Sequence, residues 1–249
     1  MNNTFTILNQ QLSKDLLTLF VAIFKKHNLS FDKPLEDAEL NEREEYIIQC
    51  IGALIAIDSS LDNLFLSIQY LSNFRSTKSL KKYEINRFDH LTYHIENFYI
   101  RLVSTLDRSL ILVDRVHRLG NTPRHCNWSV LSKNSHVRNS LTYTALKSLN
   151  KFIDPYREYR NMVIHERYLP YEGSFGQLAL LYQVFDDDGD SRLEGDYRYL
   201  TKIITDKETK IKQDEFNEIC TDLVKLLTNL LGALMDEFVI QLPKLSANE

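Results

Sequence analysis

The stretch over residues 91–116, LTYHIENFYIRLVSTLDRSLILVDRV, decides the fold. Its apolar side chains advance by threes and fours, at Leu91, Ile95, Phe98, Leu102, Leu106, Leu110, Val113 and Val116. Because an α-helix turns every 3.6 residues, this spacing places all of them on one stripe of a helix. Gly120 suits the end of such a helix, and Pro123 prevents its continuation. We predict one long helix that buries its stripe against other helices.

Helical spacing also predominates on both sides of this stretch. Towards the N-terminus it predicts two helices and then a polar connection, over residues 4–27, 41–74 and 75–82. Towards the C-terminus it predicts helices over residues 137–153, 155–168 and 213–241, while residues 175–185 fit a helix or a strand equally well. The fold class is therefore all-α. We place a boundary between an N-terminal helical hairpin, residues 1–80, and a helical domain, residues 81–249.

Apolar runs and cysteines indicate the kind of compartment. The longest uninterrupted apolar runs, residues 16–24 and 51–57, are shorter than the roughly 20 residues that cross a bilayer. Asp15 precedes the first run and no small-residue cleavage site follows it, unlike in a signal peptide. The three cysteines are far apart, so they indicate neither a disulfide framework nor a zinc site. We expect a cytoplasmic protein with no membrane partner, metal or cofactor.

Positive charge is concentrated in the middle of the chain. Residues 99–169 contain 12 Lys/Arg and 5 Asp/Glu, whereas the rest of the chain contains 18 and 29. A basic segment within an acidic protein suits an anionic partner such as nucleic acid. Solvated charges on helix surfaces would explain the same distribution.

The candidate chemistry lies in residues 156–168, YREYRNMVIHERY, which contain the string Arg160-Asn161-x-x-x-His165. Imidazoles titrate near neutral pH, so His165 can accept and release protons. The guanidinium of Arg160 is a permanent planar cation that can stabilise the negative charge of a reacting phosphoryl group. Asn161 can orient the phosphate or hold the imidazole. Each residue alone is more often a surface or packing residue, so only their joint spacing on one capped helix indicates a site.

This string resembles the signature of the HEPN domain family, an Arg followed by a His after four to six residues, often with a polar residue after the Arg. The likeness covers about residue 83 to the C-terminus and is strongest to bacterial stand-alone members of the toxin or defence type. It implies an up-and-down helical bundle that dimerises, with Arg160 and His165 of both copies in one composite site. It also implies RNA cleavage without a metal, by attack of the ribose 2′-OH on the adjacent phosphodiester.

Two other pairs fit the loose pattern, Arg87 with His94 and Arg118 with His125. The first has Phe88 where a polar residue is preferred. The second is interrupted by a glycine and a proline, so its two members cannot lie on one helix. We therefore favour Arg160 and His165.

Six further residues are candidates for RNA contacts or for support of the site. On an ideal helix Arg160 and His165 point roughly 140° apart, whereas Arg157, Asn161 and His165 form one stripe. Arg157 is therefore the alternative phosphate contact. The remaining RNA-contact candidates are Arg167, Arg101 and His94, and the supporting candidates are Glu96 and Tyr168. In one HEPN group a nucleotide-accepting Tyr lies two residues after the His, a place that Arg167 takes here.

Three interpretations are open from the sequence. The first is a HEPN-type endoribonuclease, a toxin or phage-defence effector that works as a homodimer and has an antitoxin or regulatory protein as a further partner. The second is a non-catalytic HEPN module that binds a nucleotide or RNA and relays this to a partner. The third is a structural helical protein whose motif is accidental.

Overall fold

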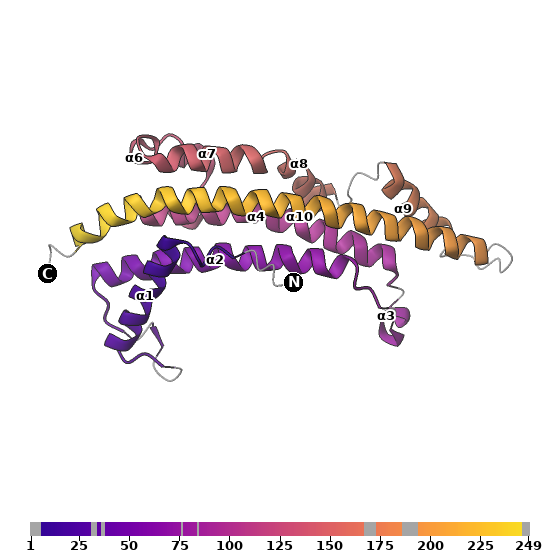
Figure 1. Cartoon of the computed structure of the whole chain (residues 1–249), viewed down its shortest axis with the longest axis horizontal. Coiled ribbons are helices and arrows are strands. Elements are labelled where there is room, and N and C mark those ends of the chain that lie inside the picture. The colour runs from indigo at the N-terminus through magenta and orange to yellow at the C-terminus, as the bar shows by residue number, and fades with distance from the viewer. Residues whose placement is uncertain are drawn as a thin grey trace. The chain divides into compact units, whose positions relative to one another are not determined.

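The computed structural model describes residues 6–30, 34–35, 38–75, 77–83, 85–166, 173–185 and 194–245, which form helices and connections but no β-strand (Figure 1). The α-helices are α1 (Gln11–Lys26), α2 (Glu42–Leu71), α3 (Lys78–Lys82), α4 (Arg87–Val116), α5 (Trp128–Leu131), α6 (Ser135–Arg138), α7 (Leu141–Ile153), α8 (Tyr156–Asn161), α9 (Gly173–Phe185) and α10 (Glu194–Gln241). The shorter elements are the 3-10 helices η2 (Pro123–His125) and η4 (Leu242–Leu245) and the π turn η3 (Met162–Glu166). The predicted all-α class is confirmed.

The chain forms two compact units, to each of which α2, α4 and α10 contribute residues. Unit 1 consists of residues 1–62, 104–154 and 222–249. Unit 2 consists of residues 63–103 and 155–221. The division at residue 80 does not follow these units and stays a prediction.

Unit 1 packs the first part of α2 against the last turns of α4 and α10. Tyr46 of α2 stacks on Phe238 of α10 with ring centroids 5.7 Å apart. The Tyr46 hydroxyl also donates a hydrogen bond to the carbonyl of Val116, at 3.1 Å. The second half of the predicted stripe, Leu106 to Val116, is fully buried here. A tyrosine between two helices thus joins apolar packing to a satisfied hydroxyl.

Unit 2 buries the first half of the same stripe. Phe98 of α4 stacks face to face on Phe216 of α10, with centroids 3.7 Å apart and planes 3° from parallel. Phe88 of α4 packs on Phe175 and Tyr182 of α9, at 5.3 and 5.5 Å. The segment that fitted a helix or a strand is therefore a helix, and aromatic contacts attach it to α4.

Helix α10 is much longer than the sequence predicts, since it begins at Glu194 instead of residue 213. The added part buries Thr201, Thr205 and Thr209. Each hydroxyl donates to the carbonyl four residues earlier, at 2.9, 2.6 and 2.7 Å. Because the hydroxyls are satisfied within the helix, their methyl groups can be buried without leaving a polar group unpaired.

Other predicted helices are confirmed with different ends. Helix α1 begins at Gln11, and the predicted helix over residues 137–153 is divided into α6 and α7. The polar connection after α2 contains the short helix α3. Asp154 has helical dihedral angles, φ −52° and ψ −44°, so it continues α7 and does not take the extended conformation usual for an N-cap. Pro155 occupies the N-cap position of α8 instead.

Helix α2 is long and apolar enough, by length and composition, to cross a membrane. The sequence prediction considered only uninterrupted apolar runs and so missed this. Half of its most apolar stretch is buried inside the protein. The core helix of a soluble bundle has the same properties, so the feature is weak evidence for a membrane partner.

Candidate active site

Helix α8 packs against α4 in unit 2 by contacts between aromatic rings. It carries Arg157, Arg160 and Asn161. Tyr159 stacks on Tyr99 of α4 with centroids 4.9 Å apart and planes 13° from parallel. Tyr156 lies on the same ring at 6.1 Å. Since Tyr156 and Tyr159 are three residues apart, they share one face of α8. The sequence reasoning missed these tyrosines, although their spacing is the signal of a helix face that packs.

Tyr99 is itself held in place by α10. It is 3% exposed, and its hydroxyl donates to Glu215 Oε1 at 3.2 Å. The other carboxylate oxygen of Glu215 accepts from Lys212 Nζ at 2.7 Å. Burial and then the neighbouring Glu215 carboxylate raise the pKa of Tyr99, so its hydroxyl stays protonated and donates. The position of α8 therefore rests on a buried, hydrogen-bonded ring.

Arg160 and Asn161 are in direct contact at the end of α8. Arg160 Nη1 donates to Asn161 Oδ1 at 3.0 Å. Arg160 is half-buried, while Asn161 is exposed. Because the amide oxygen of Asn161 accepts from the guanidinium, its Nδ2 group is the part that can donate to a ligand. The pair can present a cation and an amide donor to one phosphate.

His165 does not lie on a continuing α-helix. The sequence predicts a regular helix to residue 168, but the backbone forms a π turn over Met162–Glu166. Hydrogen bonds in a π turn join residues five apart, so the turn is wider than in an α-helix. Because each residue of a wider turn rotates the chain by a smaller angle, we expect the angle between Arg160 and His165 to be smaller than the roughly 140° of an ideal α-helix. His165 is exposed, and within the described residues no side chain hydrogen-bonds it.

Three more candidates belong to this segment. Arg157 is half-buried in the first turn of α8, on the face that it shares with Asn161. Arg167 and Tyr168 lie outside the described residues. The proposed roles of all three stay predictions.

The candidates on α4 have different surroundings. His94 packs on the rings of Tyr70 and His90, with centroids 5.3 and 4.5 Å apart. Burial, and then the charge of His90, lower the pKa of His94 to about 4. A neutral imidazole can still donate one hydrogen bond, so the role of His94 as a phosphate contact stays a prediction. Burial raises the pKa of Glu96, which is half-buried.

Arg101 lies on the face of α4 that reaches α2. Its Nε donates to Asn97 Oδ1 at 3.4 Å, and Asn97 Nδ2 donates to Ser67 Oγ at 3.0 Å. By helical position, His94 and Arg101 are roughly opposite Tyr99, which faces α8. The structure therefore brings together Arg160 and Asn161, but it places His94 and Arg101 on another face.

The two competing Arg and His pairs have other surroundings. Arg87 forms an ion pair with Asp206 at 2.6 Å. Helix α4 ends at Val116, and Arg118 beyond it has a positive φ of 54°. Arg118 and His125 therefore share no helix, as the sequence predicts.

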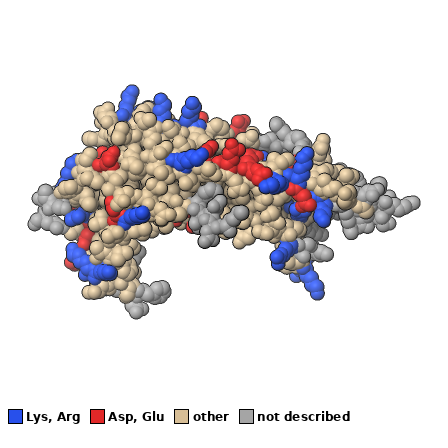
Figure 2. All heavy atoms as spheres, in the orientation of Figure 1, with Lys and Arg blue, Asp and Glu red and all other residues tan. Residues whose placement is uncertain are grey.

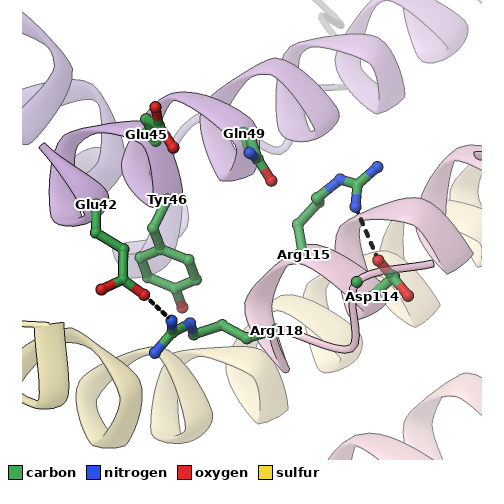
Figure 3. Close-up of a pocket in the computed structure, with 8 residues that line it drawn as sticks. Glu42, Glu45, Tyr46, Gln49, Asp114, Arg115 and Arg118 are labelled. Carbon is green, nitrogen blue, oxygen red and sulfur yellow. Dashed lines mark hydrogen bonds and ion pairs between the residues drawn. The ribbon is translucent and has the colours of Figure 1, made fainter. Parts of the chain in front are cut away.

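Unit 1 contains a pocket of about 240 Å³ that the sequence did not indicate (Figure 3). It lies between one face of α2 and the end of α4, and its lining residues are Glu42, Glu45, Tyr46, Gln49, Asp114, Arg115, Arg118 and Gly120. Arg118 forms an ion pair with Glu42, and Arg115 Nη1 donates to Asp114 Oδ2 at 3.0 Å (Figure 3). Both arginines of the pocket thus already have carboxylate partners.

Metal ligands are not gathered in the part of the chain that the structure describes. No group of three or more His, Cys, Asp or Glu side chains there could hold a metal ion. Cys50, Cys126 and Cys220 are buried and free.

Comparison with known proteins identifies the class. Residues 37–233 match the family model HEPN_Cthe2314, described as "-like HEPN". Because the match covers most of the chain, this protein belongs to that HEPN family. The match begins at residue 37, so it includes α2, which the resemblance drawn from about residue 83 left out. No curated protein and no solved structure matches the chain.

Proposed function

We propose that this protein is a metal-independent HEPN endoribonuclease, with Arg160, Asn161 and His165 as its catalytic residues. The observation that carries the proposal is the hydrogen-bonded pair Arg160 and Asn161 directly before a π turn that contains the exposed His165. π turns occur frequently at functional sites. The family membership supports the same conclusion.

The proposed reaction uses these groups in separate roles. The imidazole of His165 takes the proton of a ribose 2′-OH, and the oxygen attacks the adjacent phosphorus. The bond from phosphorus to the 5′ oxygen breaks, and His165 of a second copy protonates that oxygen. Arg160 and the Asn161 amide stabilise the charge that develops on the phosphoryl oxygens. The products are a 2′,3′-cyclic phosphate and a 5′-OH.

This scheme needs a second copy of the chain. Ile164, directly before His165, is 46% exposed, so a subunit interface at this site would bury its side chain. We propose that two copies meet there around RNA, in the cytoplasm, as a toxin or phage-defence effector. An antitoxin or regulatory protein would then restrain the activity.

Cleavage of unstructured RNA in the presence of EDTA tests the proposal. We expect cleavage by the wild type and a loss of about 100-fold or more in His165→Ala and in Arg160→Ala, with unchanged melting temperatures, because a proton carrier and a phosphate clamp act as one unit. His136→Ala, which removes an exposed histidine of unit 1, is the matched control and should cleave like the wild type. An absolute requirement for a divalent ion would contradict the mechanism.

One observation favours the non-catalytic alternative. General bases are usually oriented by a further group, and none of the described side chains hydrogen-bonds His165. RNA binding without cleavage by the wild-type dimer would support a module that binds RNA and relays this to a partner.

A further inference from the structure

Five aromatic side chains of unit 2 form a connected cluster between the end of α2 and the start of α4. This aromatic platform consists of Tyr70, Phe74, His90, Tyr93 and His94. His94 is at its centre, with ring centroids 5.3 Å from Tyr70, 4.5 Å from His90 and 5.2 Å from Tyr93. Phe74 packs on His90 at 5.3 Å. The five rings thus contact one another in one connected cluster.

The aromatic platform is open to solvent although its rings are packed. Tyr93 is 64% exposed and Tyr70 is 48% exposed. The His90 ring is held by a hydrogen bond, because its Nε2 lies 2.7 Å from the carbonyl oxygen of Tyr70 and a carbonyl can only accept, so Nε2 donates. Rings held in this way lose little conformational freedom when a flat ligand stacks on them.

Basic side chains follow directly along the chain. Residues 70–94 contain 5 Lys/Arg and 2 Asp/Glu. Arg75, Lys78 and Lys82 are all exposed, and blue side chains project from the surface where Figure 1 shows α3 (Figure 2). Along α10, exposed acidic side chains such as Asp206 and Asp214 alternate with exposed lysines such as Lys207 and Lys210. The end of unit 2 that carries the aromatic platform therefore combines exposed rings with local positive charge.

We propose that the aromatic platform stacks the unpaired bases of single-stranded RNA, while the exposed Arg75, Lys78 and Lys82 hold its phosphates. Stacking on aromatic rings beside a basic surface is how proteins bind single strands with little sequence preference. This proposal rests on the proposed function, because it assumes that the ligand is RNA. It adds that the substrate is single-stranded. By helical position on α4, the aromatic platform is away from Tyr99 and α8, so it is a contact separate from the catalytic residues.

A protein partner would use the same rings differently. Interfaces between proteins bury apolar surface and deplete Lys at their centre. The charge excess beside the aromatic platform favours a polyanion instead.

The test measures binding of full-length protein to a short, unstructured, 2′-O-methylated oligoribonucleotide, which lacks the 2′-OH nucleophile and so cannot be cleaved by the proposed mechanism. Tyr93→Ala and Tyr70→Ala should each weaken binding about tenfold. The matched control is Tyr199→Ala, which removes a tyrosine of unit 2 that is 66% exposed and lies on α10, and it should bind like the wild type. An oligonucleotide of the same length with abasic positions should bind wild type as weakly as the intact one binds Tyr93→Ala.

The possible results distinguish a failure of the aromatic-platform proposal from a failure of the proposed nuclease function. Unchanged affinity in Tyr93→Ala and Tyr70→Ala, or equal binding of the abasic and the intact strand, would overturn this proposal and point to a protein partner for the rings. If the wild type nevertheless cleaves unmodified RNA, the proposed nuclease function is still supported and only the aromatic-platform proposal is wrong. Loss of binding in both variants, with no cleavage of unmodified RNA by the wild type, would support the aromatic platform and refute the nuclease.

Discussion

Tyr159 of α8 and Tyr99 of α4 lie almost parallel, with ring centroids 4.9 Å apart and 13° between their planes. The residue directly before Arg160 is thereby fixed to a buried tyrosine, which in turn hydrogen-bonds Glu215 of α10. A guanidinium can stabilise a transition state only if it is held in place before the reaction. The stack therefore connects the packing of unit 2 to the candidate catalytic residues.

Two replacements of Tyr99 should separate the contribution of its ring stack from that of its hydroxyl hydrogen bond. Tyr99→Ala should lower the free energy of unfolding by about 3–5 kcal/mol, because it removes a fully packed ring. Tyr99→Phe keeps the stack and loses only the hydrogen bond to Glu215, so we expect a loss of about 0.5–1.5 kcal/mol. Urea unfolding measures both, and RNA cleavage should decrease far more in Tyr99→Ala. Equal losses in the two variants would show that the stack contributes nothing.

Arg160 and Arg157 should differ in kinetics. Arg160→Ala should lower the cleavage rate at saturating RNA by about 100-fold or more, as the loss of one transition-state donor does. Arg160→Lys should not restore it, because a lysine lacks the planar fork. Arg157→Ala should weaken RNA binding and leave the saturated rate unchanged. Single-turnover cleavage distinguishes these effects, and the reverse result would transfer the catalytic role to Arg157.

His94 should make stability depend on pH. Its pKa is about 4 in the folded chain against an ordinary value of 6.5, so between these values the unfolded state binds more protons. The free energy of unfolding should therefore fall as the pH decreases from 6.5 towards 4. His94→Phe keeps a ring at the position and removes the titration, so its urea midpoint should depend less on pH in this window. Parallel pH profiles for wild type and variant would rule out a contribution from His94.

Two copies of the basic motif that meet at a two-fold axis should repel each other, and bound RNA phosphates would relieve this repulsion. Light scattering at micromolar concentration should show a dimer. RNA affinity should decrease steeply with added salt, because phosphate contacts release counterions. Ile164→Asp, which places a charge beside His165, should shift the protein towards the monomer and reduce cleavage. A monomeric wild type that still cleaves RNA would exclude the composite site.

The elements that the sequence predicts well are those in which apolar residues alone form the buried face. The stripe from Leu91 to Val116 became α4, and the apolar segment after residue 41 became α2. The first half of α10 was missed because Thr201, Thr205 and Thr209 count as polar, although each hydroxyl is satisfied by its own helix. Burial in a helix depends on whether polar groups find partners, which hydropathy does not describe.

For the candidate site, the sequence indicates the residues but not their arrangement. The string with Arg160 and His165 was visible, whereas the Tyr99 stack joins residues that lie 60 positions apart and depends on tertiary packing. The sequence has no signal for the π turn either, because the residues of Met162–Glu166 suit an α-helix equally well. The local widening is seen only in the backbone.

The π turn also bears on how such a motif is aligned between proteins. A π turn accommodates one residue more than an α turn. A relative with one residue fewer between its Arg and His could carry both on an ordinary helix, where positions four apart share a face, and still present the same pair of groups. A single-residue gap at Met162–Glu166 would then indicate a change of helix type and not a loss of function. Alignments that penalise this gap would separate proteins that have equivalent sites.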